Sequence, residues 1–317
     1  MALVKCANCG QEISDKAETC IHCNAKVGKV NTEKVKVKKE KKKGNKKIII
    51  IVILIVLLAI GIFGYKFIVN KITEEKYAEA VNYFNQKEYD KASEVLEHKF
   101  LKDYGLSDDY RSAIAMMKLL EEEKYEEVLT QIDGISDEVG VKYSIKNFAK
   151  NATNYQKQDY KTIWEDNKYT TTFYNDKEKQ MVYDGIYNYA LSVYNDGYYG
   201  SSKEMFEKIK DYKNSAEILN DKYFQLIGNN YNYSTSYGYT WGYMSILFYS
   251  YGDRINYNVF TQSLFNTNLP KGNEYTYRIK NNQLIVAGDI VLFDIVSFDG
   301  YNLVIRDGNN KFTLTKT

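Results

Sequence analysis

A charge-free apolar run is the feature that most limits how this chain can fold. From Ile48 to Tyr65 the sequence reads IIIIVILIVLLAIGIFGY, which is 18 residues in a row without a charge, and apolar residues continue past Lys66 to Val69. A helix needs about 20 residues to cross the hydrocarbon core of a bilayer. A signal peptide is the alternative, but the segment before the run is too long for one and no A-x-A site follows the run directly. We expect a transmembrane helix at residues 48–69.

The charges around this run predict its orientation. Residues 1–47 contain 13 of the 43 lysine and arginine side chains but only 5 of the 41 acidic ones. Beyond the run, Lys66 and Lys71 are the nearest basic residues and two glutamates follow. Because lysines accumulate on the cytoplasmic side of a membrane helix, we expect a single-pass protein of the cell membrane with residues 1–47 in the cytoplasm and residues 70–317 outside. Residues 29–47 are rich in lysine and poor in apolar side chains, which predicts a flexible linker.

All four cysteines lie near the N-terminus, as Cys6-x2-Cys9 and Cys20-x2-Cys23. Two such turns can place four thiolates around one tetrahedral Zn²⁺ ion. Four thiolates leave no position for water, so the predicted zinc site is structural rather than catalytic. Two disulfides or a redox pair are the alternatives. The cytoplasm disfavours structural disulfides, and a redox pair needs a thioredoxin-like context that this sequence lacks.

The residue that follows each cysteine pair favours a metal-binding turn. Gly10 adopts a positive φ at no steric cost, and Asn24 tolerates the same left-handed conformation. His22 lies inside the second pair, but the four thiolates are already a complete set, so we expect an exposed loop residue. The segment Lys5–Val27 resembles the N-terminal zinc ribbons of many prokaryotic proteins. We therefore assign residues 1–28 to a zinc ribbon.

Residues 72–228 combine helical spacing of apolar residues with an approximate repeat. Four tyrosines follow one another at intervals of 36, 35 and 39 residues, with an aromatic residue or leucine five positions before each. A period of this length indicates stacked helical hairpins, although ordinary helical packing is the alternative. The segment Tyr189–Asp221 resembles tetratricopeptide-like repeats of bacterial surface and membrane proteins, which implies protein or peptide binding. The four tyrosines are Tyr89, Tyr125, Tyr160 and Tyr199.

From about Tyr237 the sequence changes to short β-branched and aromatic runs. They are separated by Asn281-Asn282, Asp299-Gly300 and Asp307-Gly308, and Asp-Gly between apolar runs is a strong hairpin signal. Five or more short strands predict a small antiparallel all-β barrel or sandwich in residues 235–317. The expected strands are Ile255–Phe260, Glu274–Lys280, Gln283–Ala287, Ile290–Phe298 and Asn302–Arg306.

This strand pattern resembles small lipocalin-like domains of bacteria. The resemblance implies that Trp241 opens the first strand and that Phe293–Phe298 pairs with Leu303–Ile305. Tyrosines are dense between residues 231 and 251, and tyrosine rings can stack on sugars, although strand packing also explains them. A glycan or another small ligand is therefore a candidate partner of the β domain.

Residues for catalysis are scarce. Outside the four cysteines there is no thiol, and the only histidines are His22 and His98. The sequence has no G-x-S-x-G, Walker or H-E-x-x-H motif. Acidic pairs such as Asp108-Asp109 are expected at helix ends. We therefore predict that the chain is not an enzyme and has no catalytic residues.

The order of the segments resembles zinc-ribbon membrane proteins of Gram-positive bacteria, some of which are tied to envelope stress. The resemblance implies a multidomain protein that binds an envelope or extracellular partner through helical repeats and a β domain. Its ribbon would act as a cytoplasmic interaction module. Two alternatives remain open. One is a regulator that binds nucleic acid through the ribbon and the basic linker, although membrane topology already explains that charge. The other is an envelope enzyme that acts on glycans through distant carboxylates.

Overall fold

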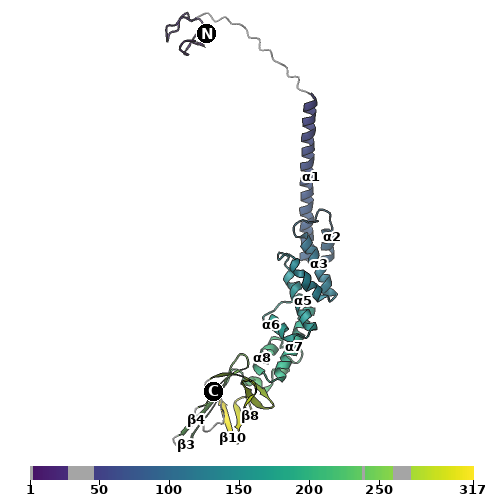
Figure 1. The fold of residues 1–317 in the computed structure, drawn as a ribbon, viewed down its shortest axis with the longest axis vertical. Coiled ribbons are helices and arrows are strands. Elements are labelled where there is room, and N and C mark those ends of the chain that lie inside the picture. The colour runs from purple at the N-terminus through teal and green to yellow at the C-terminus, as the bar shows by residue number, and fades with distance from the viewer. Residues whose placement is uncertain (1–2, 28–45, 238–239, 260–272) are drawn as a thin grey trace. The chain divides into compact units, whose positions relative to one another are not determined.

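In the computed structural model the chain consists of two compact units, Met1–Phe67 and Ile68–Thr317 (Figure 1). In the first unit, β1 (Leu3–Lys5) and β2 (Glu12–Ser14) form an antiparallel hairpin. The expected linker lies outside the described residues except for its last two lysines, which belong to helix α1. The structure describes residues 3–27, 46–237, 240–259 and 273–317.

Helix α1 (Lys46–Asn85) contains the whole charge-free run. From Ile48 to Ile68 its large apolar side chains are exposed, including Phe63, Tyr65 and Phe67 near the end of the run. Exposure of so much apolar surface to water is strongly unfavourable. The helix is long and apolar enough to cross a membrane.

The second unit continues from α1 with a series of short and longer helices. The shorter ones have few residues to bury, so each depends on its neighbours for stability. Two 3₁₀ turns, η1 and η2, complete the series. The helices are α2 (Tyr89–Leu96), α3 (Ser107–Glu121), α4 (Tyr125–Gln131), α5 (Lys142–Gln156), α6 (Tyr160–Asn167), α7 (Asp176–Asn195), α8 (Tyr199–Lys208) and α9 (Ser215–Ile218), with η1 (Ile132–Gly134) and η2 (Lys222–Leu226).

The same turn precedes four of these helices. Each of the four periodic tyrosines is the first residue of a short helix, α2, α4, α6 or α8. Two residues before each tyrosine the backbone is left-handed, at Lys87, Glu123, Gln158 and Gly197. The next N–H donates to the carbonyl five residues earlier in all four turns, as in the 2.9 Å bond from Glu88 to Tyr83. This is the 6→1 bond of a Schellman motif, and it ends the preceding helix. The sequence period thus corresponds to one turn that is built four times.

In the described part of the chain, eight antiparallel strands form a barrel in the closed order β10-β3-β4-β5-β6-β7-β8-β9. Figure 1 labels four of them, β3, β4, β8 and β10. Closure is made where β10 pairs with β3, at Thr315↔Asn232 and Lys316↔Tyr231. A closed barrel has no unpaired edge that could recruit another strand. The strands are β3 (Asn230–Tyr237), β4 (Thr240–Phe248), β5 (Arg254–Val259), β6 (Glu274–Lys280), β7 (Gln283–Val286), β8 (Ile290–Phe298), β9 (Asn302–Asp307) and β10 (Asn310–Lys316).

Several strand expectations are confirmed and one is wrong. The left-handed residues Asn281 and Asn282 form the turn between β6 and β7, as their sequence suggests. Strands β8 and β9 pair through Phe298↔Leu303, as expected. Trp241, however, does not open the first strand, because β3 precedes it and Trp241 lies in β4 opposite Ser236. The polar residues that alternate with tyrosine in β3 concealed this strand.

Aromatic side chains fill the barrel. Tyr231, Phe248 and Tyr277 come from three different strands, and their rings meet edge to face at 5.9 and 5.2 Å between centroids. Tyr257 and Phe293 meet at 5.7 Å. An eight-stranded barrel is just wide enough for side chains to fill it. Of the tyrosines between residues 231 and 251, Tyr231 therefore serves packing, whereas Tyr243 and Tyr251 are exposed.

One apolar core joins the barrel to the last helices. It extends from Ile163 in α6 through Phe206 in α8 and Phe224 in η2 to barrel residues as far as Leu314. A separate core holds the earlier helices, from Ala80 to Ala152. The end of the helical region and the barrel therefore form one packed body.

Candidate metal centre and junction groove

The four cysteines come together at one point. Their Sγ atoms all lie within 4.8 Å of one another, with 3.8 Å between Cys6 and Cys23 and 3.7 Å between Cys9 and Cys20. A tetrahedron with bonds of 2.3 Å has edges of about 3.8 Å, whereas a disulfide bond measures about 2.05 Å. All four thiols are free. The arrangement can hold a metal ion.

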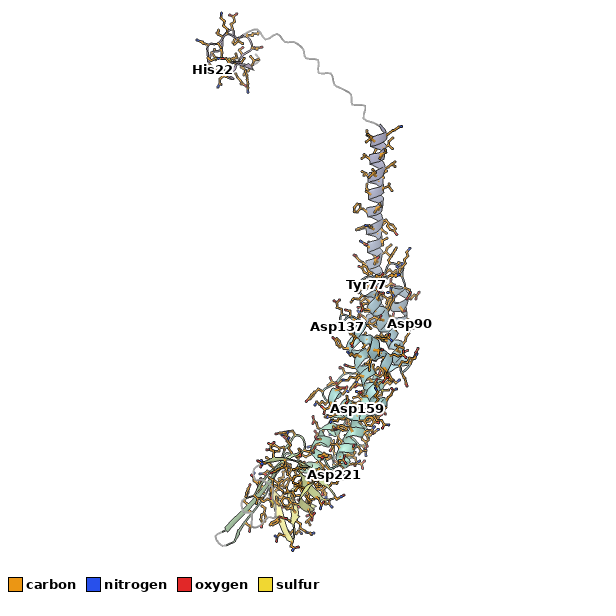
Figure 2. All side chains as sticks on the ribbon, in the orientation of Figure 1. His22, Tyr77, Asp90, Asp137, Asp159 and Asp221 are labelled. Atoms are coloured by element: carbon orange, nitrogen blue, oxygen red, sulfur yellow. The ribbon has the colours of Figure 1, made fainter. Side chains whose placement is uncertain are left out.

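Two equivalent turns position these sulfur atoms. The N–H of Gly10 donates to the carbonyl of Cys6 at 2.8 Å, and the N–H of Asn24 donates to that of Cys20 at 2.9 Å. Gly10 and Asn24 both have positive φ, +75° and +57°, as their residue types predict. His22, labelled in Figure 2, is exposed, and it is not part of the cysteine cluster.

Hydrogen-bond donors around the cysteines favour thiolates. The backbone N–H of Asn8 lowers the pKa of Cys6. The N–H of Ala25, helped by the Asn8 side chain, lowers the pKa of Cys23 to about 6. The N–H of Gln11 also lowers the pKa of Cys9, but burial and the neighbouring thiols outweigh it and raise that pKa to about 12. Thiolates this close together repel one another, and a cation bound among the four sulfur atoms offsets that repulsion.

The other candidate residues have structural partners. The His98 ring packs edge-on against Phe100 just after α2. Asp108 pairs with Arg111, and the Asp109 carboxylate accepts the N–H of Ser136 at 2.6 Å. The acidic pair thus lies at the start of α3, as expected for helix-end residues.

A groove of about 630 Å³, here called the junction groove, lies where the helices meet the barrel. Its aromatic residues are Trp164, which is 6% exposed, and the half-buried Tyr189 and Tyr198. Acidic side chains outnumber basic ones along its walls. The groove is lined by Trp164, Glu165, Lys168, Tyr189, Ser192, Val193, Asp196, Tyr198, Ser201, Glu204, Met205, Asp253, Arg254 and Thr276.

Asp253 fixes the barrel to the start of α8. Its carboxylate accepts the N–H of Gly200 at 2.6 Å and both the N–H and the hydroxyl of Ser201. An acceptor in this position satisfies helix N–H groups that otherwise lack partners. Burial raises the pKa of the Asp253 carboxyl, and the donors from Ser201 and Gly200 act in the opposite direction. The backbone adds a bond of 2.9 Å from Ile279 to the carbonyl of Gly197.

We expect Asp253→Ala to lower the free energy of unfolding by about 1–3 kcal/mol, because it leaves the first N–H groups of α8 without an acceptor. Urea unfolding of the full chain, followed by tryptophan fluorescence, measures the change. Asp289→Ala is the control, since Asp289 also lies in a barrel turn but its side chain is 92% exposed. Equal stability of the two variants contradicts the capping role.

Sequence patterns pointed to the cysteines but not to Asp253, whose partners lie more than 50 positions away. Comparison of the chain with protein-family models, with curated proteins and with solved structures finds no match. The residues and their geometry are therefore the basis for any functional conclusion.

Proposed function

We propose that this chain is a non-enzymatic, single-pass membrane protein whose outer part, residues 70–317, binds an envelope or extracellular protein. The observation that best supports it is the junction groove. Helices and barrel share one core there, and both contribute residues to a concave surface with aromatic side chains. Tyr and Trp are the residues that most often carry binding energy at protein interfaces.

The membrane topology in this proposal has residues 1–47 in the cytoplasm. It is supported by the exposed apolar surface of α1 and by the lysines that precede it. Phe63, Tyr65 and Phe67 lie at the far end of the run, where aromatic side chains commonly mark the membrane–water interface.

The metal in this proposal is one structural Zn²⁺ ion, held by the four cysteines. Tetrahedral sites with four thiolates suit zinc, and they leave no coordination position for a substrate. The zinc would supply folding free energy, because Cys6, Ile13 and Cys20 are the only buried apolar side chains within residues 3–27. A ribbon of this kind would serve as the cytoplasmic interaction module.

The helical region is proposed to be tetratricopeptide-like. The support is the turn that occurs four times, each time followed by a fully buried residue three positions after the tyrosine. The barrel is proposed to be lipocalin-like in strand order. Because aromatic side chains fill its interior, we place the binding surface on the outside, at the junction groove.

Mutation of the groove tests this function. Cross-linking in intact cells, followed by affinity purification of the full chain, should recover a partner that also binds the purified chain. We expect Tyr198→Ser to weaken that binding about tenfold, or about 1.4 kcal/mol, because it removes an aromatic contact from the groove. Tyr169→Ser is the matched control, since Tyr169 is 82% exposed and does not line the groove. Equal loss, or no loss, in the two variants argues against the groove as the binding surface.

A further inference from the structure

A second pocket, here called the polar pocket, lies among α5, α6, the start of α7 and the loop that precedes α7. Its volume is about 280 Å³, and it shares no lining residue with the junction groove. Nine of its lining residues are polar or charged, and two aromatic residues complete the wall. The pocket is lined by Ser144, Asn147, Lys150, Asn151, Asp166, Asn167, Thr170, Thr172, Phe173, Tyr174 and Glu178.

A buried carboxylate is the central group of this pocket. Glu178 is 3% exposed, and it lies in the first turn of α7, which Asn175 caps. One carboxylate oxygen accepts the N–H of Tyr174 at 2.6 Å. The other accepts the side-chain amide of Asn151 at 2.8 Å. Each oxygen has two lone pairs, so each can accept a further hydrogen bond.

The surrounding amides present only donors to this carboxylate. The carbonyl of Ile163 accepts the Asn167 amide at 2.9 Å, which fixes the orientation of that side chain. The same amide donates to the oxygen of Asn151 at 2.7 Å, so Asn151 turns its own NH₂ group toward Glu178. A protonated carboxyl would need an acceptor, and these neighbours offer none to it. The network is therefore built for ionised Glu178.

This negative charge has no cationic partner in the described part of the chain. The Lys150 ammonium in the same pocket pairs with Asp166 at 2.8 Å, which leaves Glu178 with neutral donors alone. Burial raises the pKa of Glu178 accordingly. A buried charge without a counter-ion is costly, and a bound cation removes part of that cost.

We propose that the polar pocket binds an amino sugar, whose protonated amine pairs with Glu178. The hydroxyl and amide side chains around the pocket match the hydroxyl groups of a sugar ring. Phe173 and Tyr174 line the pocket, and a sugar ring can stack on aromatic side chains of this kind. The volume lies near the lower end of ligand pockets, about 300 Å³, which suits a single sugar unit.

Isothermal titration of the full chain in detergent micelles tests this proposal. The probes are glucosamine, galactosamine and mannosamine, each compared with its neutral sugar at pH 6.5. We expect at least one hexosamine to bind at millimolar concentration or below, and its neutral sugar at least tenfold more weakly. Glu178→Gln should weaken hexosamine binding at least tenfold. Glu207→Gln, an exposed residue of α8 that lines neither the polar pocket nor the junction groove, should leave it unchanged.

A second variant covers the case in which Glu178→Gln fails to fold. Asn147 is exposed and lines the pocket, so Asn147→Lys introduces a competing ammonium group without disturbing the core. We expect the same tenfold loss from it. The proposal is overturned if none of the three hexosamines binds, if the neutral sugars bind equally well, or if Asn147→Lys retains full affinity. These outcomes are independent of the junction groove, because the two pockets share no residue.

Discussion

Replacing Cys20 with serine is expected to abolish metal binding and to unfold residues 3–27, while residues 68–317 keep their structure. The ribbon has too few buried side chains to fold without its metal, and structural zinc sites contribute about 10–16 kcal/mol at neutral pH. The remainder of the chain is a separate compact unit with its own cores. Metal content of the purified full chain, together with hydrogen exchange of the two regions, measures both effects.

His22→Ala is the matched control for this prediction. His22 lies between Cys20 and Cys23 but is exposed and outside the cluster, so this variant should retain one metal ion per chain. Loss of metal in His22→Ala, or slow exchange of the ribbon in Cys20→Ser, contradicts a four-cysteine structural site.

Among glycine-to-alanine substitutions where the helices contact the barrel, we expect Gly197→Ala to be the most destabilising. A Cβ atom at this position would lie 2.2 Å from the carbonyl oxygen of Ile279, and the φ of Gly197 is +89°. The added methyl must displace barrel backbone, and alanine is strained at positive φ. We expect the free energy of unfolding to fall by about 2–5 kcal/mol, measured by urea unfolding of the full chain.

Substitutions at two further glycines separate the steric clash of the added Cβ atom from the backbone strain at positive φ. Gly308→Ala adds strain at positive φ but meets nothing within 4 Å, so it should cost about 1–2 kcal/mol. Gly200→Ala has no such strain, but its Cβ would lie 1.9 Å from the Gly252 carbonyl oxygen, so it reports the clash alone. If Gly197→Ala is no worse than Gly308→Ala, the barrel is not held tightly against α8.

The sequence was most informative where the chemistry is local. Two cysteine pairs followed by Gly10 and Asn24 indicated both turns of the ribbon, since the residue types that tolerate positive φ stand at fixed offsets. The tyrosine period marked the four similar turns through the spacing of the side chains around them, since only Gly197 among their left-handed residues is of a type that favours positive φ. Asn281-Asn282 identified the β6–β7 hairpin.

Contacts between residues far apart in the chain could not be predicted from local sequence patterns. The pairing of β3 with β10 closes the barrel, but no local pattern indicates which strands will meet. Asp253 resembles any turn aspartate until the fold brings it to α8. Asn175 and Glu178 have the spacing of a capping box, yet only the packing of α5 and α6 against α7 reveals that this carboxylate is buried.

The side on which residues 70–317 lie is tested most directly by thiol labelling. All native cysteines lie in the first 23 residues, so the wild-type chain reports the N-terminal side by itself. A Tyr169→Cys variant adds one thiol at a highly exposed site in the second unit. In intact cells bounded by a single membrane, an impermeant maleimide should label this variant but not the wild type, and lysis with chelation should expose the native thiols. Labelling of the wild type in intact cells, with no additional label in Tyr169→Cys until lysis, contradicts the proposed topology.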